Sequence, residues 1–328
     1  MMRRRDFITL LGSAAAAWPL GARAQQPAVP VIGVLGSSSG QSYAPLFVAF
    51  LQGLKASGFV EGQNVVIEQR WANDQYDRLP AMAADLVRAR VALIMTIGNS
   101  LAPRAAQAAT TTIPIVFSAG VDPVAAGFVA SLNRPSGNMT GASILSNELG
   151  PKRLELLHQL APNAAAMAVL LNPTNPNLVP QTKVLQAAAG ALGVDLQVLP
   201  VRSDQDIDAA FANMAARHVG AFLIGPDSFF FSRNAQIAAL ALRHALPAMY
   251  QWREFAAAGG LISYGPRVTE PYREAGVYAG RILKGERPAD LPVVQSSKIE
   301  MVINLRTAKA LGLTVPTPLL VAADEVLE

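Results

Sequence analysis

Short apolar runs alternate with amphipathic stretches along most of the chain after residue 26. Runs such as VPVIGVLG (29–36), ALIMTIG (92–98) and AMAVLLN (166–172) predict buried strands, because strands covered on both faces are apolar throughout. Stretches such as 43–57 repeat apolar residues at helical spacing and predict helices that pack by one face. Strands that alternate with helices of this length predict βαβ units and parallel sheets.

The same two patterns, apolar runs for strands and helical spacing for helices, predict the remaining elements. The further expected strands are 65–72, 113–119, 195–201, 221–225, 247–251, 259–266 and 298–305, and the expected helices are 43–57, 76–89, 100–109, 152–160, 177–192, 205–217, 233–245, 272–284 and 307–311.

The alternation pauses once, over residues 121–143, which are rich in Gly, Pro, Ser and Asn. Four β/α units precede the pause and a second series follows it, so we expect two doubly wound α/β lobes with a boundary near 121–145. Additional elements follow the second series. We therefore expect the chain to cross between the lobes more than once and to form a hinge, an interpretation that one continuous sheet would contradict.

The N-terminus has the three parts of a secretory signal: a basic start, an apolar stretch over Phe7–Leu20 and a small-residue site from Ala22 to Ala24. The residues RRDFI (4–8) also resemble a twin-arginine export signal. A basic amphipathic surface helix is the alternative, which the run of alanines and the A-x-A ending disfavour. We expect cleavage after Ala24 and a periplasmic mature protein, exported by the twin-arginine or the general route.

Composition and charge narrow the class of partner. The chain has 328 residues, of which 51% are hydrophobic and 15% charged, enough to bury a sizeable core. The formal net charge is +4, but Arg3, Arg4, Arg5 and Arg23 less Asp6 contribute +3 of it. The rest of the chain is close to neutral, so nucleic acid is not an expected partner. The absence of cysteine excludes disulfides, thiol nucleophiles and a lipid-modified cysteine anchor.

Candidate binding residues come from the loops that follow the expected strands. In open parallel sheets, ligands bind at the carboxyl ends of the strands, where loops and helix N-termini converge. These loops combine Gly or Pro with short hydrogen-bonding side chains. The candidate ligand-binding residues are Ser37, Ser38, Gly98, Asn99, Ser100, Asp122, Asn172, Thr174, Asp227, Tyr250 and Tyr264.

Each candidate also has a purely structural interpretation. Ser, Asn and Asp are the usual helix N-cap and turn residues. Asp122 and Asp227 therefore either hold an amine or hydroxyl groups of a ligand or cap a helix. Tyr250, Tyr264 and Trp252 either flank a ligand ring or pack in the core. Only the joint placement of these residues predicts a pocket.

The sequence contains no recognisable chemical centre. His158, His218 and His244 fall in or beside expected helices, and no G-x-S-x-G motif is present. The stretch GVLGSSSG (33–40) follows a strand but lacks the spacing of a nucleotide-binding loop. We therefore expect no catalytic residue, no metal and no cofactor, with an exported two-lobed enzyme as an alternative.

The sequence resembles the family of ABC-transporter substrate-binding proteins that includes tryptophan-type and sugar-binding members. The resemblance covers essentially the whole mature chain. The matching stretches are GFVEGQNVVIEQRWA (58–72), YDRLPAMAADLV (76–87), TIPIVFSAGVDPVAAGFVASLNRPSGNMTG (112–141), KRLELL (152–157), LPAMYQWREFAAAGGLISYGP (246–266), ILKGERPADLPVVQSSKIEMVINLRTAKALGL (282–313) and ADEVLE (323–328).

The resemblance implies the type I periplasmic-binding fold, in which three crossovers join two Rossmann-like lobes and the ligand lies in the cleft. The corresponding lobes are 27–141 with 265–292 and 142–264 with 298–328. It also implies an inner-membrane permease and ATPase as partners. The expected function is that of a monomeric binding protein of an importer, whose ligand is an amino acid, an aromatic acid or a sugar. A sensory module with the same fold is the alternative.

Overall fold

The computed structural model describes residues 29–328, except residues 145 and 297. The expected signal peptide, with its cleavage point after Ala24, lies outside the described residues. Among the helices of the described residues, none is long and apolar enough to cross a membrane.

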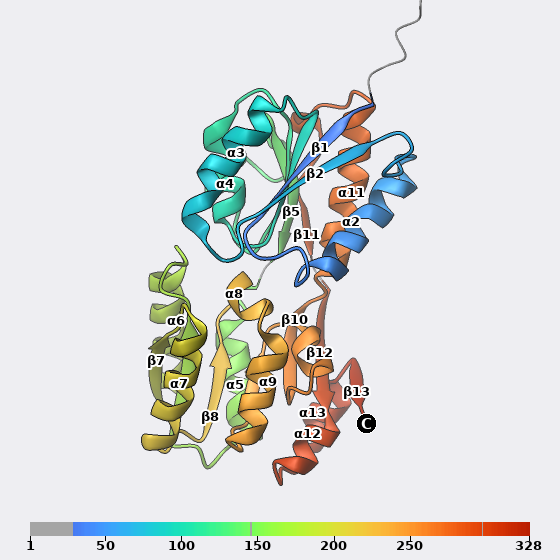
Figure 1. Cartoon of the computed structure of the whole chain (residues 1–328). Coiled ribbons are helices and arrows are strands. Elements are labelled where there is room, and N and C mark those ends of the chain that lie inside the picture. Colours follow the sequence, from blue (N-terminus) through green and yellow to red (C-terminus); the bar gives the residue numbers. More distant parts are fainter. Residues whose placement is uncertain (1–28, 145, 297) are drawn as a thin grey trace, which may run out of the picture.

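The described residues form two α/β lobes, with lobe 1 above lobe 2 in Figure 1. The strands of lobe 1 are β1 (Val31–Gly36), β2 (Val66–Trp71), β3 (Leu93–Ile97), β4 (Ile115–Ala119), β5 (Met139–Ile144) and β11 (Val294–Ser296). Its helices are α2 (Ala44–Ala56), α3 (Leu79–Arg88), α4 (Leu101–Ala109) and α11 (Thr269–Leu283), with short 3-10 helices η1 (Tyr76–Arg78) and η2 (Pro288–Asp290).

Lobe 2 contains the remaining elements. Its strands are β6 (Ala166–Leu171), β7 (Asp195–Pro200), β8 (Ala221–Ile224), β9 (Ala248–Tyr250), β10 (Ile262–Pro266), β12 (Ile299–Asn304) and β13 (Glu325–Leu327). Its helices are α5 (Gly150–Leu160), α6 (Leu178–Leu192), α7 (Asp204–Ala216), α8 (Ser228–Phe231), α9 (Asn234–Arg243), α10 (Arg253–Ala257), α12 (Leu305–Ala310) and α13 (Thr317–Ala322).

Each lobe is built on its own sheet. The lobe 1 sheet has the order β11-β5-β4-β3-β1-β2, and all its pairings are parallel. The lobe 2 sheet has the order β13-β12-β10-β9-β8-β6-β7, and β10 and β12 form its antiparallel pair. The prediction of two doubly wound lobes with mostly parallel sheets is confirmed.

Helices cover both faces of the lobe 1 sheet, so its inner strands β1, β3, β4 and β5 are buried on both sides. One face packs against α2 and α11, and the other against α3 and α4. Helices α2 and α11 lie side by side (Figure 1), and two glycines allow the close approach. A Cβ on Gly53 would collide with the carbonyl oxygen of Arg273, and one on Gly276 with that of Phe50. This contact fixes a late segment of the chain onto the first lobe.

The chain passes between the lobes after β5, after β10 and after β11. Residues 142–144 belong to β5, where Ala142 and Ser143 pair with Ser118 and Ala119 of lobe 1. Residues 265–266 belong to β10 and pair with β12 of lobe 2. Two of the crossings thus lie slightly later than the boundaries expected at 141 and 264. The sequence MTGASI of β5 hid this strand, because small and polar residues do not form an apolar run.

Candidate functional site: a cleft between the lobes

The loops at the carboxyl ends of strands from both lobes meet at the space between them. They enclose a small cavity of about 60 Å³, here called the inner chamber. Its lining residues are Tyr43, Leu46, Gly98, Asn99, Ser100, Gly120, Val121, Ile144, Ser146, Asn147, Asn175, Asn177, Pro226, Asp227, Ser228, Phe231, Trp252, Val268 and Tyr272. Both lobes and two of the crossings contribute, so movement of the lobes changes the shape of this chamber.

A larger cavity of about 490 Å³, here called the outer hollow, continues from the inner chamber. It shares Ser100, Val121, Asn147, Asn177 and Pro226 with the chamber, so the two are parts of one cleft. Its other lining residues are Arg104, Asp122, Ala125, Ala126, Glu148, Gly150, Pro151, Arg153, Pro176, Pro180, Gln181, Val184, Leu185, Leu223, Ile224 and Gly225. Apolar side chains predominate among them, whereas Asp122 and Glu148 are exposed.

Gly98, Asn99 and Ser100 connect β3 to α4 at the floor of the chamber. Gly98 has φ +109°, and a Cβ there would collide with Ser37 Oγ. That hydroxyl accepts a hydrogen bond from the Asn99 amide (3.1 Å), while Asn99 Oδ1 accepts one from the Leu101 amide (3.0 Å). Asn99 Nδ2 is buried and has no partner among the described residues. The loop therefore presents an unused N–H donor at the cleft.

Asp227 lies on the lobe 2 side of the chamber and accepts four hydrogen bonds. Three come from side chains: Tyr76 Oη (2.9 Å), Asn172 Nδ2 (3.0 Å) and Asn175 Nδ2 (2.7 Å). The fourth comes from the Phe229 amide (2.9 Å), which makes Asp227 the N-cap of α8. Burial raises the pKa of the Asp227 carboxyl, and these hydrogen bonds oppose the shift. The carboxylate is thus already engaged by the protein itself.

Direct contacts join the two lobes at one end of the cleft. We call the residues involved the latch: Ser37, Asp74 and Tyr76 of lobe 1 with Asp227, Ser228 and Arg233 of lobe 2. The contacts are Ser37 Oγ to Ser228 Oγ (2.9 Å), Tyr76 Oη to Asp227 Oδ1 (2.9 Å) and Arg233 Nη1 to Asp74 Oδ2 (2.7 Å). These bonds join side chains of the two lobes directly, so the lobes are in contact at this end of the cleft.

Aromatic side chains from both lobes surround the inner chamber. The Tyr43 ring lies 5.0 Å from that of Phe231, which in turn meets Trp252 edge to face at 5.3 Å. Tyr272 Oη accepts a hydrogen bond from the Gly98 amide (3.3 Å), and burial raises its pKa to about 12. The indole Nε1 of Trp252 is buried without a partner among the described residues. The walls are therefore suited to an apolar or aromatic group.

The buried guanidinium of Arg153 in α5 connects two of the crossings beneath the outer hollow. Its Nε donates to the Tyr264 carbonyl (2.7 Å), and its Nη1 to the Ser146 carbonyl (2.8 Å). Burial lowers the pKa of Arg153 to about 9, so the side chain remains charged at neutral pH. Because Ser146 follows β5 and Tyr264 lies in β10, this side chain joins the starts of two crossings.

Five of the sequence-predicted residues line the cleft. Gly98, Asn99, Ser100 and Asp227 line the inner chamber, and Asp122 lines the outer hollow. Both acidic residues act as caps, since Asp122 Oδ1 accepts the amides that start the next turn and Asp227 caps α8.

Four further candidates lie beneath or beside the lining. Ser37 and Asn172 hold Asn99 and Asp227 in place, and the carbonyl of Ser38, itself buried, accepts the Asn73 amide. Thr174 donates its hydroxyl to Asn172 Oδ1 and lies at the surface. These residues position the loops rather than face the cavity.

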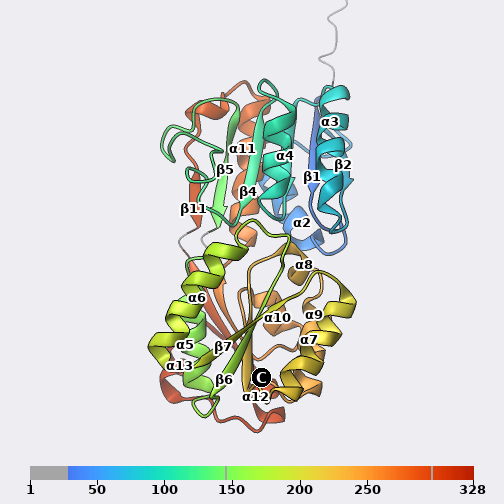
Figure 2. The same ribbon diagram turned by 90° about the vertical axis from the view of Figure 1, so that its left-hand side faces the viewer.

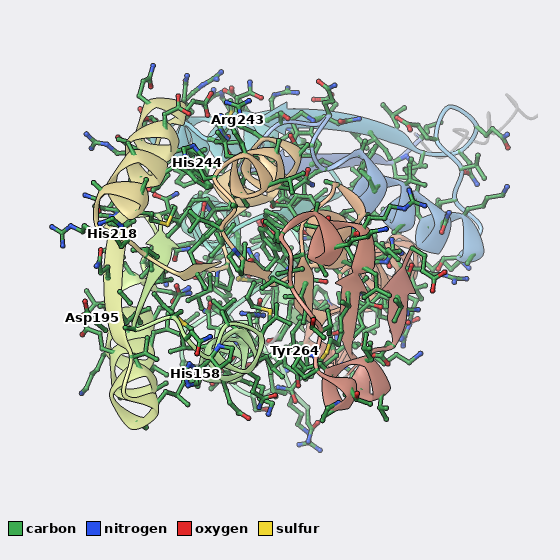
Figure 3. All side chains as sticks on the ribbon, turned by 90° about the horizontal axis from the view of Figure 1, so that it is seen from below. His158, Asp195, His218, Arg243, His244 and Tyr264 are labelled. Atoms are coloured by element: carbon green, nitrogen blue, oxygen red, sulfur yellow. The ribbon has the colours of Figure 1, made fainter. Side chains whose placement is uncertain are left out.

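The two tyrosines chosen from the sequence lie away from the cleft lining. Tyr250 stacks on Phe255 in the core of lobe 2, with ring centroids 4.7 Å apart. Tyr264 packs at the edge of the core on the opposite face of that sheet. Viewed from the lobe 2 end, Tyr264 and the three histidines His158, His218 and His244 are spread over that lobe (Figure 3). The histidines therefore do not gather into one site.

Tyr43, Phe231, Trp252 and Tyr272 form the aromatic walls; the sequence analysis raises Trp252 as either a ring contact or a core residue and does not point to the other three. Tyr43, Phe231 and Tyr272 belong to helices or helix starts, whereas the search covered only strand-end loops. Trp252 lies two residues past the end of β9, while Tyr250 within the strand faces the core. The signal that could have found Trp252 is this position past the strand end.

Sequence and structure comparisons relate the chain to known binding proteins. A tyrosine-binding protein of Clostridioides difficile (strain R20291) is 27% identical over 265 residues, 80% of this chain and 75% of that protein. The ABC domain of Streptococcus pneumoniae in complex with L-Trp is 25% identical with a TM-score of 0.80. The alignment covers 91% of this chain and 99% of that one.

A third relative differs more from this chain in overall shape. The ligand-free, open structure of a substrate-binding protein with adhesive properties from Clostridium difficile is also 25% identical and covers the same shares of both chains. Its TM-score is 0.63, well below the 0.80 of the complex with L-Trp. The shape of this chain is therefore nearer to the ligand-bound relative, in keeping with the direct contacts of the latch.

The family assignment rests on a match to nearly the whole described chain. The sequence model of the family described as "ABC transporter substrate binding protein" matches residues 31–327. The matched region includes both lobes, all three crossings and every residue of the cleft. The chain belongs to the ABC transporter substrate-binding protein family.

Proposed function

We propose that the mature chain is the periplasmic substrate-binding component of an ABC importer and that it captures a small organic solute between its lobes. The observation that carries the proposal is the cleft itself, whose lining comes from both lobes and from the crossings. A solute bound there touches surfaces that come together only when the lobes close. Residues 27–141 with 265–292 and 142–264 with 298–328 approximate the two moving units.

The cycle that follows is physical and requires no chemical step. A ligand shifts the equilibrium between open and closed forms by the difference in its affinity for the two. Moving that equilibrium from 1:99 to 99:1 needs about 5.5 kcal/mol of differential binding. The latch supplies part of the closed-state stability, which lowers the share that the ligand must provide. An inner-membrane permease and its ATPase then recognise the closed form.

The test is a thermal-shift and calorimetric screen of residues 25–328 against amino acids, aromatic acids and sugars. A ligand at 100 times its Kd stabilises the folded protein by about 2.7 kcal/mol, a clear rise in melting temperature. Ser100→Phe fills the junction of the two cavities and is expected to abolish the shift, while Ser131→Phe at an exposed loop retains it. Turnover of a solute without a stable complex would instead indicate an enzyme.

A further inference from the structure

The buried side-chain atoms that lack a hydrogen-bond partner among the described residues of the cleft are all donors. Among the described residues that line the inner chamber or the outer hollow, two buried side-chain atoms lack a partner: Asn99 Nδ2 and Trp252 Nε1. Both are N–H donors. The orientation of the Asn99 amide follows from its other contact, because Oδ1 accepts the Leu101 amide. Asn99 is only 9% exposed, so its free N–H has little access to water.

Three acceptors of the inner chamber, Asp227 and the carbonyls of Pro226 and Gly120, are in contrast already engaged. The Asp227 carboxylate accepts four hydrogen bonds, as described above. The carbonyl of Pro226 accepts from Asn175 Nδ2 (3.2 Å), and that of Gly120 from Asn147 Nδ2 (3.0 Å). An unpaired buried donor is costly, whereas these satisfied acceptors gain little from a further partner. The chamber therefore favours a ligand group that accepts hydrogen bonds.

The same pattern disfavours a ligand with a positive charge. Among the described residues that line the inner chamber, Asp227 is the one acidic side chain, and it already accepts three hydrogen bonds at Oδ1 and one at Oδ2, so an ammonium group would compete with donors of the protein itself. An ammonium ion buried without a counter-ion costs far more than a neutral polar group. Asp122 and Glu148 of the outer hollow are exposed, so an ion pair with them would be weak in water.

The two cavities also differ in volume. The inner chamber, at about 60 Å³, is smaller than the cavity of about 150 Å³ that binds benzene in another protein. The outer hollow, at about 490 Å³, falls in the range of about 300–1,000 Å³ that small-molecule sites occupy. A small acceptor group thus fits the chamber, while a ring or an apolar body fits the hollow.

We propose that the ligand is an apolar or aromatic carboxylic acid without an ammonium group, its carboxylate in the inner chamber beside Asn99 and Trp252 and its body in the outer hollow. This inference rests on the proposed function, since it assumes that the cleft is the solute site. It separates the ligand from free amino acids, which carry an ammonium group. It also separates it from sugars, whose hydroxyl groups need acceptors as well as donors.

The experiment compares ligands that differ only in the ammonium group. Isothermal titration at pH 7 pairs 3-phenylpropanoic acid with L-phenylalanine, 3-(4-hydroxyphenyl)propanoic acid with L-tyrosine, and indole-3-propanoic acid with L-tryptophan. We expect at least one of the acids to bind on the order of 100-fold more tightly than its amino acid, because an unpaired buried charge is strongly unfavourable. The corresponding alcohol, 3-phenylpropan-1-ol, is expected to bind weakly because it lacks the carboxylate.

Two variants locate the carboxylate. Asn99→Asp keeps the shape of the side chain and its bond to Leu101 but replaces the free donor with a negative charge. We expect it to weaken binding of the acid by at least about tenfold. Asn163→Asp makes the same charge change at an exposed residue and is the control. Trp252→Phe removes the second donor and is expected to weaken the acid several-fold, with the melting temperature of each variant confirming that it folds.

Each remaining outcome overturns the inference in a distinguishable way. Tighter binding of the amino acid refutes it but leaves the proposed function intact. Equal affinity of the wild type and Asn99→Asp for the acid refutes the placement of the carboxylate. If no member of any pair binds, the inference fails, and the sugars of the wider screen decide whether the proposed function stands.

Discussion

The two ends of the cleft close in different ways. At the latch, side chains of the two lobes bond to each other, and Asp227 accepts hydrogen bonds from donors of both lobes. At the outer hollow, α4 of lobe 1 and α5 and α6 of lobe 2 face each other across about 490 Å³, and the hydrogen bonds run through Asn147 of the first crossing, which donates to the Gly120 carbonyl and accepts from Gln181 of α6. One end of α6 and the short helix α8 both face lobe 1 (Figure 2), but only α8 carries a latch residue.

This difference separates two tasks that a binding protein must perform. The latch stabilises the closed form whatever the cleft contains, whereas the outer hollow offers contacts that only a ligand can complete. A ligand therefore does not have to supply the whole free energy of closure. Changes at the latch should alter the conformational equilibrium, and changes at the hollow should alter affinity and selectivity.

The largest effect is expected from Asp227→Ala, which removes the centre of the latch. The hydroxyl of Tyr76 and the amides of Asn172 and Asn175 lose their shared acceptor, and α8 loses its N-cap. We expect the free energy of unfolding to fall by about 3 kcal/mol, measured by urea denaturation. Asp77→Ala, at an exposed residue beside Tyr76, is the control. Equal loss in both variants would show that Asp227 has no special role.

An intermediate effect is expected at the other end of the cleft from Val184→Trp. Val184 lines the outer hollow and is 48% exposed, so an indole there can occupy the hollow without disturbing the core. We expect ligand affinity to fall about tenfold, measured by titration calorimetry. Val179→Trp places the same side chain on the same helix at a residue that is 73% exposed and outside the hollow. Similar losses of ligand affinity in both variants would show that the ligand does not bind in the outer hollow.

The smallest effect is expected from Tyr76→Phe, which removes one hydroxyl of the latch and little else. The lost hydrogen bond contributes about 1 kcal/mol, so the ratio of closed to open protein should fall several-fold. Energy transfer between dyes on cysteines introduced in the two lobes measures this ratio, since the chain has no cysteine of its own. Tyr264→Phe is the matched control within lobe 2. An unchanged ratio for Tyr76→Phe would contradict the idea of a ligand-independent latch.

The fold could be predicted from the sequence wherever an element is long and apolar. Strands β1, β3 and β6 are continuous apolar runs, because helices cover both faces of their sheets. Strand β5 was missed because MTGASI is built from small residues. The short elements β11, β13, α8, α10 and α13 carry too few residues to show a period. Their positions depend on neighbours that are distant in sequence.

Of the candidate site, the sequence predicts only which loops contribute to it, because the topology of the sheets places the strand-end loops together. The rule that ligands lie at strand ends selects Gly98, Asn99, Ser100 and Asp227, which line the inner chamber. It could not show that Ser37 and Ser228, 191 residues apart, share a hydrogen bond. Nor could it show which polar groups remain free, because that depends on every partner in the closed form. The preference for an acceptor on the ligand is therefore visible only in three dimensions.

The contact of α11 with α2 has a consequence for the order of folding. One face of the lobe 1 sheet is covered by a helix that the ribosome makes only after nearly all of lobe 2, and lobe 2 in turn needs β12 and β13 from the end of the chain. Neither lobe can complete its sheet and core before the last sixty or so residues are synthesised. Contacts of such long sequence separation form slowly. Folding of both lobes is thus coupled to the C-terminal segment, and truncation there should impair the two lobes together rather than lobe 2 alone.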